Sequence, residues 1–461
     1  MANQPKQASQ PGLLRQLGFF SATALVISNM IGAGIFGTTG FMAGDLGSPG
    51  LILACWGVGA LFAIAGALSY SELGINFPSS GGEYVYLTRA FGPEWGFMTG
   101  WVSFFAGFSA PIAASALLFA DYLSHFFPSL SLSTGITLGS GTFALTIGNG
   151  QLVASSLIAG FTILNCFGVA RTAKVQNVLT TTKLVVLVGF LVLAFGVGMG
   201  DWGHFSQPAV RTSTASLPAQ FFVSLLWVMV GYSGWNAATY VAEEIRHPER
   251  TLPLALAAGT GIVAVLYLAL NVAFIYATPL QRLAGVPRVG ELSASNLFGG
   301  NVAGAFAALM ALCIVSTVSA EVTIGPRVYY AMAKNKAFFG SAAVVHPRWH
   351  TPVVAILSQG LCAMIMTLTS FRELLTYIGM SLTLFSALSV ASLFVLRRRP
   401  GWQRLRAVDL AWPVLPAAYI VVALAMMVFG VIQHPVASLA ALGTVGVGAL
   451  VYHFKVRPAR V

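Results

Sequence analysis

Two short glycine-containing stretches decide how this chain folds. They read IGAGIF at residues 31–36 and GYSGWN at residues 231–236. Each lies inside a long apolar segment, where a glycine weakens a helix by about 1 kcal/mol relative to alanine. A helix that unwinds inside a membrane needs protein, water or a ligand to satisfy its freed backbone groups. The two stretches therefore predict interrupted membrane helices that border a polar site.

The composition around these stretches is that of a membrane protein. Of 461 residues, 57% are hydrophobic and 8% are charged, against about 25% charged in an average soluble domain. This balance excludes a soluble enzyme, a disordered chain and a coiled coil. Apolar segments long enough to cross a bilayer predict twelve transmembrane helices, at about 17–42, 49–75, 94–124, 150–168, 177–199, 218–244, 254–279, 296–333, 352–370, 373–397, 411–431 and 436–455.

Basic residues indicate how these helices are oriented. Nineteen of the 24 Lys and Arg fall in loops and tails on the side of the N-terminus, and four fall on the other side. Because such an excess marks the cytoplasmic side, we expect a multi-pass protein of the cell membrane with both termini in the cytoplasm. The net charge of +11 then reports orientation and not a nucleic-acid partner. The stretch at 131–150 is expected to be an external loop.

The pairing of the two breaks suggests a repeat and a ligand. They lie 199 residues apart, each in the first helix of a five-helix half, which is typical of an inverted repeat. Half-helix ends present N–H groups to a carboxylate and C=O groups to an ammonium, so an amino-acid backbone fits. The alternative is that the glycines only let helices pack closely. The predicted substrate site comprises Ile31, Gly32, Ala33, Gly34, Ile35, Val230, Gly231, Tyr232, Ser233 and Gly234.

Several motifs resemble one transporter family. GAGIF at 32–36 is similar to the GSGIF-type signature of the amino acid–polyamine–organocation superfamily. Further similarities are PSSGGEYVY at 78–86, GWN at 234–236 with VAEEI at 241–245, and RVYYAMA at 327–333, in the same order and spacing. Within the superfamily, the chain most resembles the L-amino-acid transporter branch.

The resemblance implies an all-α, LeuT-like fold of twelve helices, with a five-plus-five inverted repeat and helices 1 and 6 broken. It also implies alternating access and a neutral L-amino acid as substrate. Ala33 and Val230 depart from residues common in the family, and the loop from Ser124 to Asn149 lacks the cysteine that links such chains to a heavy chain. No disulfide-linked partner is therefore expected. The implied parts are a tail at 1–16, repeats at 17–199 and 218–397, two helices at 411–455 and a tail at 456–461.

Two charges inside the predicted membrane region are candidates for ion coupling. Lys183 matches the lysine that replaces a sodium ion in sodium-independent members of the family; the alternative is a side chain that reaches the interface. Glu321 is expected to face Lys183 and form an ion pair that carries a proton or only stabilises the fold. The alternative for Glu321 is a salt bridge with Arg327.

The remaining predictions concern gating and function class. Trp235, Asn236, Glu243 and Glu244 are expected to close the inner gate, with simple packing or a solvated face as the alternative. The sequence lacks HExxH, P-loop and GxSxG motifs, which argues against an enzyme, a cofactor or a metal site. We predict a sodium-independent exchanger or proton-coupled transporter of small neutral amino acids. The alternative is a cationic amino acid or polyamine carrier, although 18–44 and 218–242 contain no acidic residue.

Overall fold

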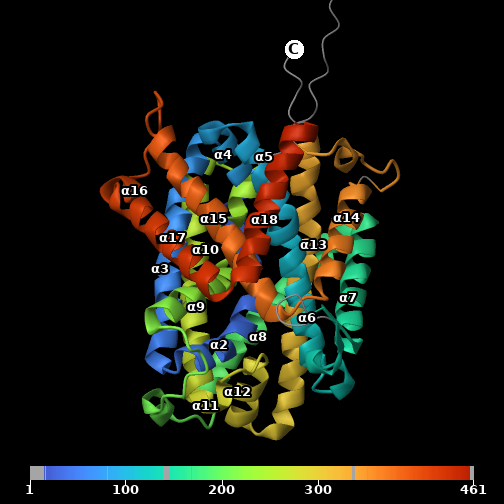
Figure 1. Cartoon of the computed structure of the whole chain (residues 1–461), viewed down its shortest axis with the longest axis vertical. Coiled ribbons are helices and arrows are strands. Elements are labelled where there is room, and N and C mark those ends of the chain that lie inside the picture. Colours follow the sequence, from blue (N-terminus) through green and yellow to red (C-terminus); the bar gives the residue numbers. More distant parts are fainter. Residues whose placement is uncertain are drawn as a thin grey trace, which may run out of the picture.

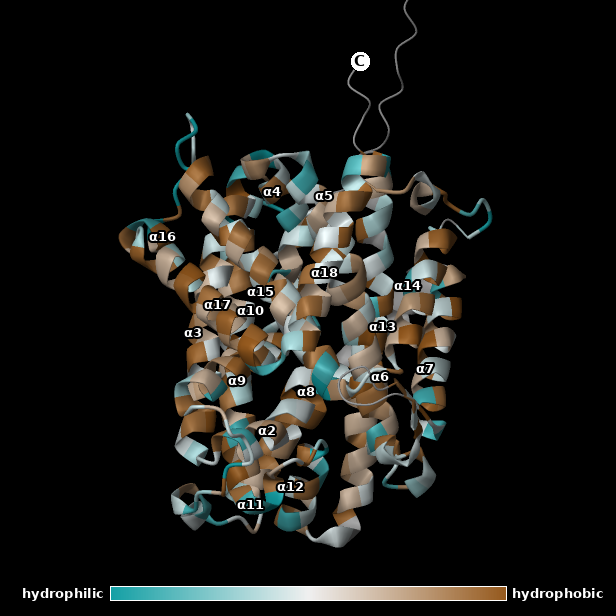
Figure 2. Ribbon diagram, in the orientation of Figure 1, coloured by the Kyte–Doolittle hydropathy of each residue, from teal (hydrophilic) through white to brown (hydrophobic). Residues whose placement is uncertain are grey.

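The structure is a computed structural model that describes residues 15, 17–79, 81–138, 145–167, 169–334, 338–349 and 351–456. Within these ranges, the side chains of residues 169–177, 180, 244, 301, 327 and 331 are not described. Most helices stand side by side in one upright bundle (Figure 1). The flanks of the bundle are hydrophobic, and hydrophilic residues gather toward its two ends (Figure 2). We call these ends the α4 face and the α12 face, after the short helices α4 (Glu83–Phe91) and α12 (Val289–Phe298) that lie there.

The first half of the chain is mainly helical, and the first of its predicted spans is broken. A bend of 41° separates α1 from α2. Between α5 and α6 a π-helical stretch, η1, keeps the third span continuous. The helices of this half are α1 (Phe19–Met30), α2 (Ala33–Leu46), α3 (Pro49–Asn76), α5 (Pro93–Val102), η1 (Ser103–Ser109), α6 (Ala110–Leu123), α7 (Asn149–Cys166) and α8 (Val169–Gly196), with short turns at η2 (Pro128–Leu130), η3 (Leu132–Thr134) and η5 (Trp202–Ser206).

The second half of the chain is also built mainly of long helices. Its first helix, α9, is followed by a separate 3-10 segment, η6. The elements are α9 (Leu217–Tyr232), η6 (Ala237–Glu244), α10 (Pro248–Ala277), α11 (Leu280–Leu283), α13 (Gly300–Lys334), η7 (Gly340–Ala343), α14 (Val353–Met366), α15 (Phe371–Leu396), α16 (Arg406–Leu410), α17 (Val414–Gln433), α18 (Pro435–Val451) and η8 (Tyr452–Val456).

The helices have the length and surface of membrane spans. Eight of those described are long and apolar enough to cross a membrane, or nine if the bent pair α1–α2 is one span. Two shorter apolar helices lie at Thr181–Gly196 and Val353–Met366. Val265 on α10 is 70% exposed and Val421 on α17 is 64% exposed. Large apolar side chains exposed along a bundle's flank are a hazard in water but suit hydrocarbon. The structure is therefore that of a polytopic membrane protein.

The predicted loop at 131–150 contains a small hairpin that the sequence analysis missed. The strands β1 (Ile136–Leu138) and β2 (Leu145–Ile147) pair antiparallel, with Ile136 opposite Ile147. Both strands alternate a β-branched threonine with larger apolar residues, a pattern that favours strands. The surrounding Gly, Ser and Thr concealed this short pattern.

A buried ion pair fastens α3 to the segment that follows α15. Both carboxylate oxygens of Glu72 accept hydrogen bonds from Arg397, at 2.6 and 2.7 Å. The Trp402 indole and the Leu405 amide add bonds of 2.8 and 3.1 Å to the same carboxylate. The Arg397 guanidinium also lies 4.0 Å from the centre of the Trp412 ring. A paired and hydrogen-bonded charge of this kind fixes one arrangement of the chain.

Candidate functional site

The first break is shorter than predicted. α1 ends at Met30, and only Ile31 and Gly32 are non-helical before α2 begins at Ala33. Ala33, Gly34 and Ile35 therefore form the first turn of α2. The N–H groups of a first turn have no partner within their own helix and carry the positive end of its dipole. The break thus presents α2's N-terminal donors and α1's last carbonyls next to each other.

The second break follows Tyr232, where α9 ends. Residues 233–236 form turns, and the chain continues as η6. Gly234 has φ +97°, and a β-carbon there would lie 2.8 Å from the backbone carbonyl of Asn29 in α1. Because a side chain is strained at this φ and has no room, the position requires glycine. The break in the sixth span is therefore built against the first.

The two breaks touch each other through glycine backbones. A β-carbon on Gly34 would lie 2.3 Å from the Cα of Gly231. Close packing, the alternative interpretation of these glycines, is therefore real at this contact. It coexists with the breaks, because the same glycines let two interrupted helices meet without a side chain between them. Tyr232 is fully buried beside this contact, and its hydroxyl donates to the Trp56 carbonyl at 3.2 Å.

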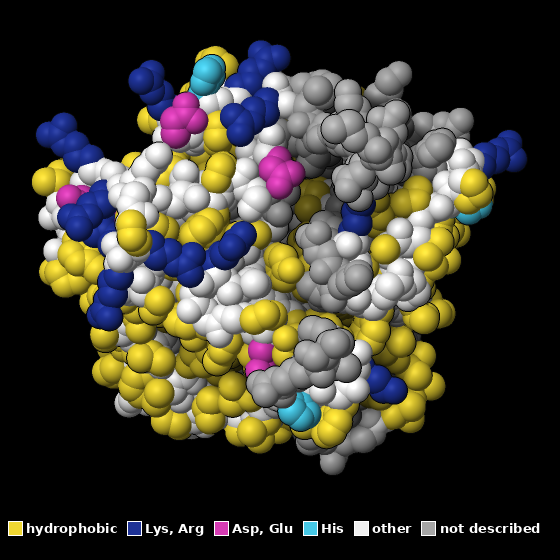
Figure 3. All heavy atoms as spheres, turned by 90° about the horizontal axis from the view of Figure 1, so that it is seen from above, with side chains coloured by type: hydrophobic (Ala, Val, Ile, Leu, Met, Phe, Trp, Pro, Cys, Tyr) yellow, Lys and Arg dark blue, Asp and Glu magenta, His cyan; other side chains and the backbone are white. Residues whose placement is uncertain are grey.

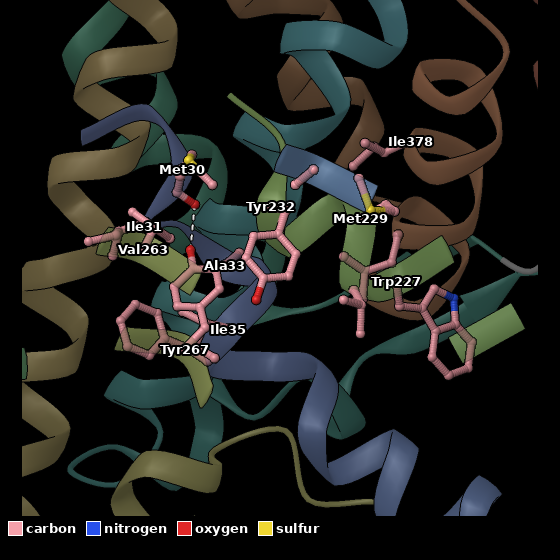
Figure 4. Close-up of a cluster of buried hydrophobic side chains, with 14 of the residues drawn as sticks. Met30, Ile31, Ala33, Ile35, Trp227, Met229, Tyr232, Val263, Tyr267 and Ile378 are labelled. Atoms are coloured by element: carbon pink, nitrogen blue, oxygen red, sulfur yellow. Dashed lines mark hydrogen bonds between the residues drawn. The ribbon is translucent and has the colours of Figure 1, made fainter. Parts of the chain in front are cut away.

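Tyr267 of α10 bridges the two breaks, and the sequence analysis missed it. Its hydroxyl oxygen lies 2.6 Å from the Met30 carbonyl oxygen and 3.1 Å from that of Gly231. Figure 4 shows Tyr267 pointing at Met30, with Tyr232 beside it. The Trp56 ring packs edge-on against both tyrosines. Nothing in the sequence separates Tyr267 from the other twelve tyrosines, since its role depends on where α10 packs.

Lys183 of α8 also contacts the first break. Its side chain is buried, and Nζ donates to the Ile31 carbonyl at 2.6 Å and to Thr317 Oγ1 at 3.0 Å. The Thr317 hydroxyl in turn donates to the Ile31 carbonyl at 3.2 Å. The alternative of a lysine that reaches the membrane interface is therefore wrong. A fixed ammonium lies at the carbonyl that the break exposes.

The predicted ion pair between Lys183 and Glu321 is absent from this structure. No hydrogen bond or ion pair joins them, and Glu321 Oε2 lacks any hydrogen-bond partner within the described residues. The reason is the register of α13, since Glu321 follows Thr317 by four residues, about 6 Å along a helix. Thr317 meets the ammonium and Glu321 lies one turn further on. The alternative partner Arg327 has no described side chain.

A cavity of about 160 Å³ opens beside the breaks and is lined by both Glu321 and Glu83. No Lys, Arg or His borders it among the described residues. The predicted site residues divide into two groups. Val230, Ser233, Gly234, Trp235 and Asn236 line the cavity, whereas Ile31, Gly32, Ala33, Gly34, Ile35, Gly231 and Tyr232 are packed behind it at the contact between the breaks.

The predicted gate residues do not form one group. Trp235 and Asn236 border the main cavity. Glu243 instead lines a second, separate hollow on the α4 face with Arg89 and Arg399. The side chain of Glu244 lies outside the described residues.

The α12 side of the breaks is closed. The Asp45 carboxylate at the end of α2 pairs with Arg372 at the start of α15. The Arg372 guanidinium lies 4.8 Å from the centre of the Trp227 ring. Backbone bonds from Thr212 to Gly44 and from Gly285 to Gly40, both 2.8 Å, hold two linkers over α2. The cavity and this seal lie on opposite sides of the breaks.

Comparison with known proteins places this architecture in a family. A serine/threonine exchanger of Bacillus subtilis is 28% identical over 410 residues, which are 88% of each chain. The human large neutral amino acids transporter small subunit 2 is 29% identical over 459 residues, covering 96% of this chain and 81% of the relative. The human Asc-type amino acid transporter 1 is 27% identical over 444 residues, 94% and 80% of the two chains. Since the amino acid permease family model also matches residues 17–448, this chain belongs to the amino acid permease family.

Proposed function

We propose that this protein carries small neutral L-amino acids across the cell membrane by alternating access, without sodium, either by exchange or together with protons. The observation that carries the proposal is the buried Lys183 ammonium on the Ile31 carbonyl. A fixed positive charge there supplies what a bound sodium ion would otherwise supply to the carbonyls of a broken helix. Relatives named for serine, threonine and large neutral amino acids support the substrate class.

The backbone of an amino acid matches the groups at the breaks. In this structure the groups that would hold that backbone are packed behind the cavity, so we propose that they reach the substrate when the contact between the breaks opens. The substrate carboxylate would then face the N–H groups of Ala33 and Gly34 at the start of α2. Its ammonium would face the carbonyls of Met30 and Gly231, near the Tyr267 hydroxyl. The side chain would extend toward Val230 and Ser233 in the cavity wall. Recognition of the backbone alone leaves side-chain choice to the cavity.

The topology we propose has twelve spans and a five-plus-five inverted repeat, with the predicted boundaries at 17–199, 218–397 and 411–455. Support comes from the two breaks, each in the first helix of its half. We also propose that the α4 face and both termini are cytoplasmic. Figure 3 looks down on the α4 face, where Lys and Arg side chains gather, as expected for a cytoplasmic surface.

With this orientation the structure represents an inward-facing state. The cavity then opens toward the cytoplasm, and the Asp45–Arg372 pair closes the external side. Trp235 and Asn236 would form the inner gate, with Glu243 and Glu244 at its cytoplasmic end. Glu321 is the proposed proton acceptor if transport is proton-coupled, because its Oε2 is unpartnered at the cavity wall.

One observation favours the alternative of a cationic amino acid or polyamine as substrate. Glu83 and Glu321 line the same cavity, and no basic side chain borders it in the described part of the chain. A substrate ammonium would satisfy the free oxygen of Glu321. The neutral class remains our proposal, because the segments 18–44 and 218–242, which contain both breaks, have no acidic residue.

We further propose that the protein works in the lipid bilayer without a disulfide-linked heavy chain. The four cysteines are free, and Cys55, Cys166 and Cys313 are buried. The loop from Ser124 to Asn149 contains none.

Proteoliposomes test the function directly. Vesicles are prepared empty or preloaded with unlabelled L-serine, in sodium or choline buffer, with and without a pH gradient. We expect uptake of labelled L-serine that is equal in sodium and choline. Uptake only into preloaded vesicles identifies exchange, and gradient-driven uptake into empty vesicles identifies proton coupling. Labelled L-lysine and putrescine test the alternative. Sodium-dependent uptake, or accumulation of no amino acid, would contradict the proposal.

A further inference from the structure

The short helix α4 is pressed onto the broken sixth span by two glycines. Gly81 and Gly82 precede α4 with φ values of +134° and +47°, which favour glycine. A β-carbon on Gly82 would lie 2.9 Å from Thr239 Oγ1 and 3.0 Å from the Tyr240 ring, both in η6. The loop therefore brings the first side chain of α4, Glu83, directly to the break.

The Glu83 carboxylate joins three elements at that point. Its Oε1 accepts a hydrogen bond of 2.7 Å from the Tyr70 hydroxyl of α3 and one of 3.2 Å from Asn236 Nδ2. Asn236 Nδ2 also lies 3.1 Å from the Tyr240 hydroxyl. Glu83 is 7% exposed and lines the main cavity. No Lys, Arg or His pairs with it in the described part of the chain, so neutral donors alone hold this carboxylate.

The same contacts fix the aromatic side of the break. The Tyr70 ring packs edge-on against Trp235 at 4.7 Å. A β-carbon on Gly66 of α3 would lie 2.9 Å from the Trp235 ring, so the indole fills the space that this glycine leaves. Glu83 therefore contacts two residues of the cavity wall, Asn236 directly by a hydrogen bond and Trp235 indirectly through the Tyr70 ring. The other titratable groups around it are Tyr86 of α4, Tyr240 of η6 and Tyr419 of α17.

We propose that Glu83 is a positioning residue for transport, which acts through Asn236 to hold the break of the sixth span in the conformation with the cavity open to the α4 face. The inference rests on the proposed function. A hydrogen bond to an ionised acceptor is about twice as strong as one between neutral groups. Glu83→Gln keeps the shape and the acceptor oxygen but removes that extra strength. The conformation with the cavity open then becomes less populated. The apparent affinity of the transporter for substrate at the α4 face falls in proportion to that population.

The test compares the two faces of the transporter. Exchange of labelled L-serine is measured in oriented proteoliposomes, with KM determined separately at the α4 face and the α12 face. For Glu83→Gln we expect the ratio of the α4-face KM to the α12-face KM to rise about fivefold. Glu94→Gln is the matched control, because Glu94 is an exposed carboxylate at the start of α5 on the same face, and the ratio should not change. The midpoint of thermal unfolding verifies that each variant is folded.

A double-mutant cycle distinguishes positioning from a purely structural role. Asn236→Ala should shift the KM ratio in the same direction. Because Glu83 acts through Asn236, adding Glu83→Gln to Asn236→Ala should change the ratio less than twofold further. An unchanged ratio in Glu83→Gln, or independent effects that multiply, would overturn the inference and leave the proposed function intact. Absence of L-serine exchange by the unmodified protein would overturn both.

Discussion

Two carboxylates on apolar helices differ completely in their surroundings. Glu72 of α3 is fully buried and accepts bonds from Arg397, Trp402 and the Leu405 amide. Glu321 of α13 lines the cavity, and its Oε2 has no hydrogen-bond partner in the described part of the chain. A buried carboxylate is costly unless charge and hydrogen bonds compensate it. The carboxylate of Glu72 is therefore compensated within the fold, whereas that of Glu321 is not, which is why we propose Glu321 as the residue that meets a ligand or a proton.

The largest effect on stability is expected at Glu72, whose buried charge is fully compensated by Arg397 and by hydrogen bonds. Arg397→Met leaves the Glu72 carboxylate without its cation, and we expect the free energy of unfolding to fall by about 3–5 kcal/mol. The midpoint of thermal unfolding in detergent measures the change. Adding Glu72→Gln should recover part of the loss, since no uncompensated charge then remains. If Arg397→Met left the midpoint of thermal unfolding unchanged, the Glu72–Arg397 ion pair would not be needed for stability.

Lys183→Met is expected to impair transport more than stability. It removes a charge-assisted hydrogen bond from the Ile31 carbonyl, and such bonds contribute about 1.5–3 kcal/mol. We expect exchange of L-serine to slow by about 10- to 100-fold. Lys334→Met, at the exposed end of α13, is the control. Equal exchange rates in the two variants would contradict the role of Lys183.

Glu321→Gln should stabilise the protein, whereas Arg397→Met, which leaves Glu72 without its cation, should destabilise it. Removing an unpartnered carboxylate should raise the free energy of unfolding by about 1 kcal/mol. It should also flatten the pH dependence of proton-driven uptake. If the variant is destabilised as Arg397→Met is, the contrast between the two carboxylates fails. If its uptake keeps the original pH dependence, Glu321 is not the proton acceptor.

The smallest effect concerns Glu83, a third carboxylate that is partly compensated. Burial raises the pKa of Glu83 above its ordinary value of 4.5, and bonds from Tyr70 and Asn236 oppose the rise. The folded protein therefore holds this proton more tightly than the unfolded chain, so its contribution makes stability fall as pH rises through the range above 4.5. Glu83→Gln should remove this dependence of stability on pH, which is measured as the free energy of unfolding at a series of pH values. A slope of the opposite sign in the unmodified protein, relative to the variant, would contradict the burial argument.

The breaks and Lys183 were predictable because each violates a local rule. Glycines inside an apolar helix and a charge inside a span are both costly, so both mark positions where something else compensates. The length of the first break was not predictable. Whether Ala33 and Gly34 continue the helix depends on what α9 presents to them, and the sequence does not contain that contact.

Partners across the bundle could not be predicted for a different reason. The sequence places Thr317 and Glu321 on the same helix, but only the packing of α8 decides which of them meets Lys183. Tyr267 and Tyr70 act through hydroxyl groups that thirteen tyrosines share. The role of Glu83 depends on a loop conformation that brings it to a break 153 residues away. Local chemistry identifies unusual residues, whereas three-dimensional packing chooses their partners.

The position of Tyr267 also sets one hydrogen-bond donor against two acceptors. A phenol has a single proton to donate, yet its oxygen lies within hydrogen-bonding distance of two carbonyls, at Met30 and at Gly231. The two carbonyls therefore share one proton or compete for it. The proton can turn from one carbonyl to the other without leaving the site, so this one side chain of α10 links the end of α1 to the end of α9.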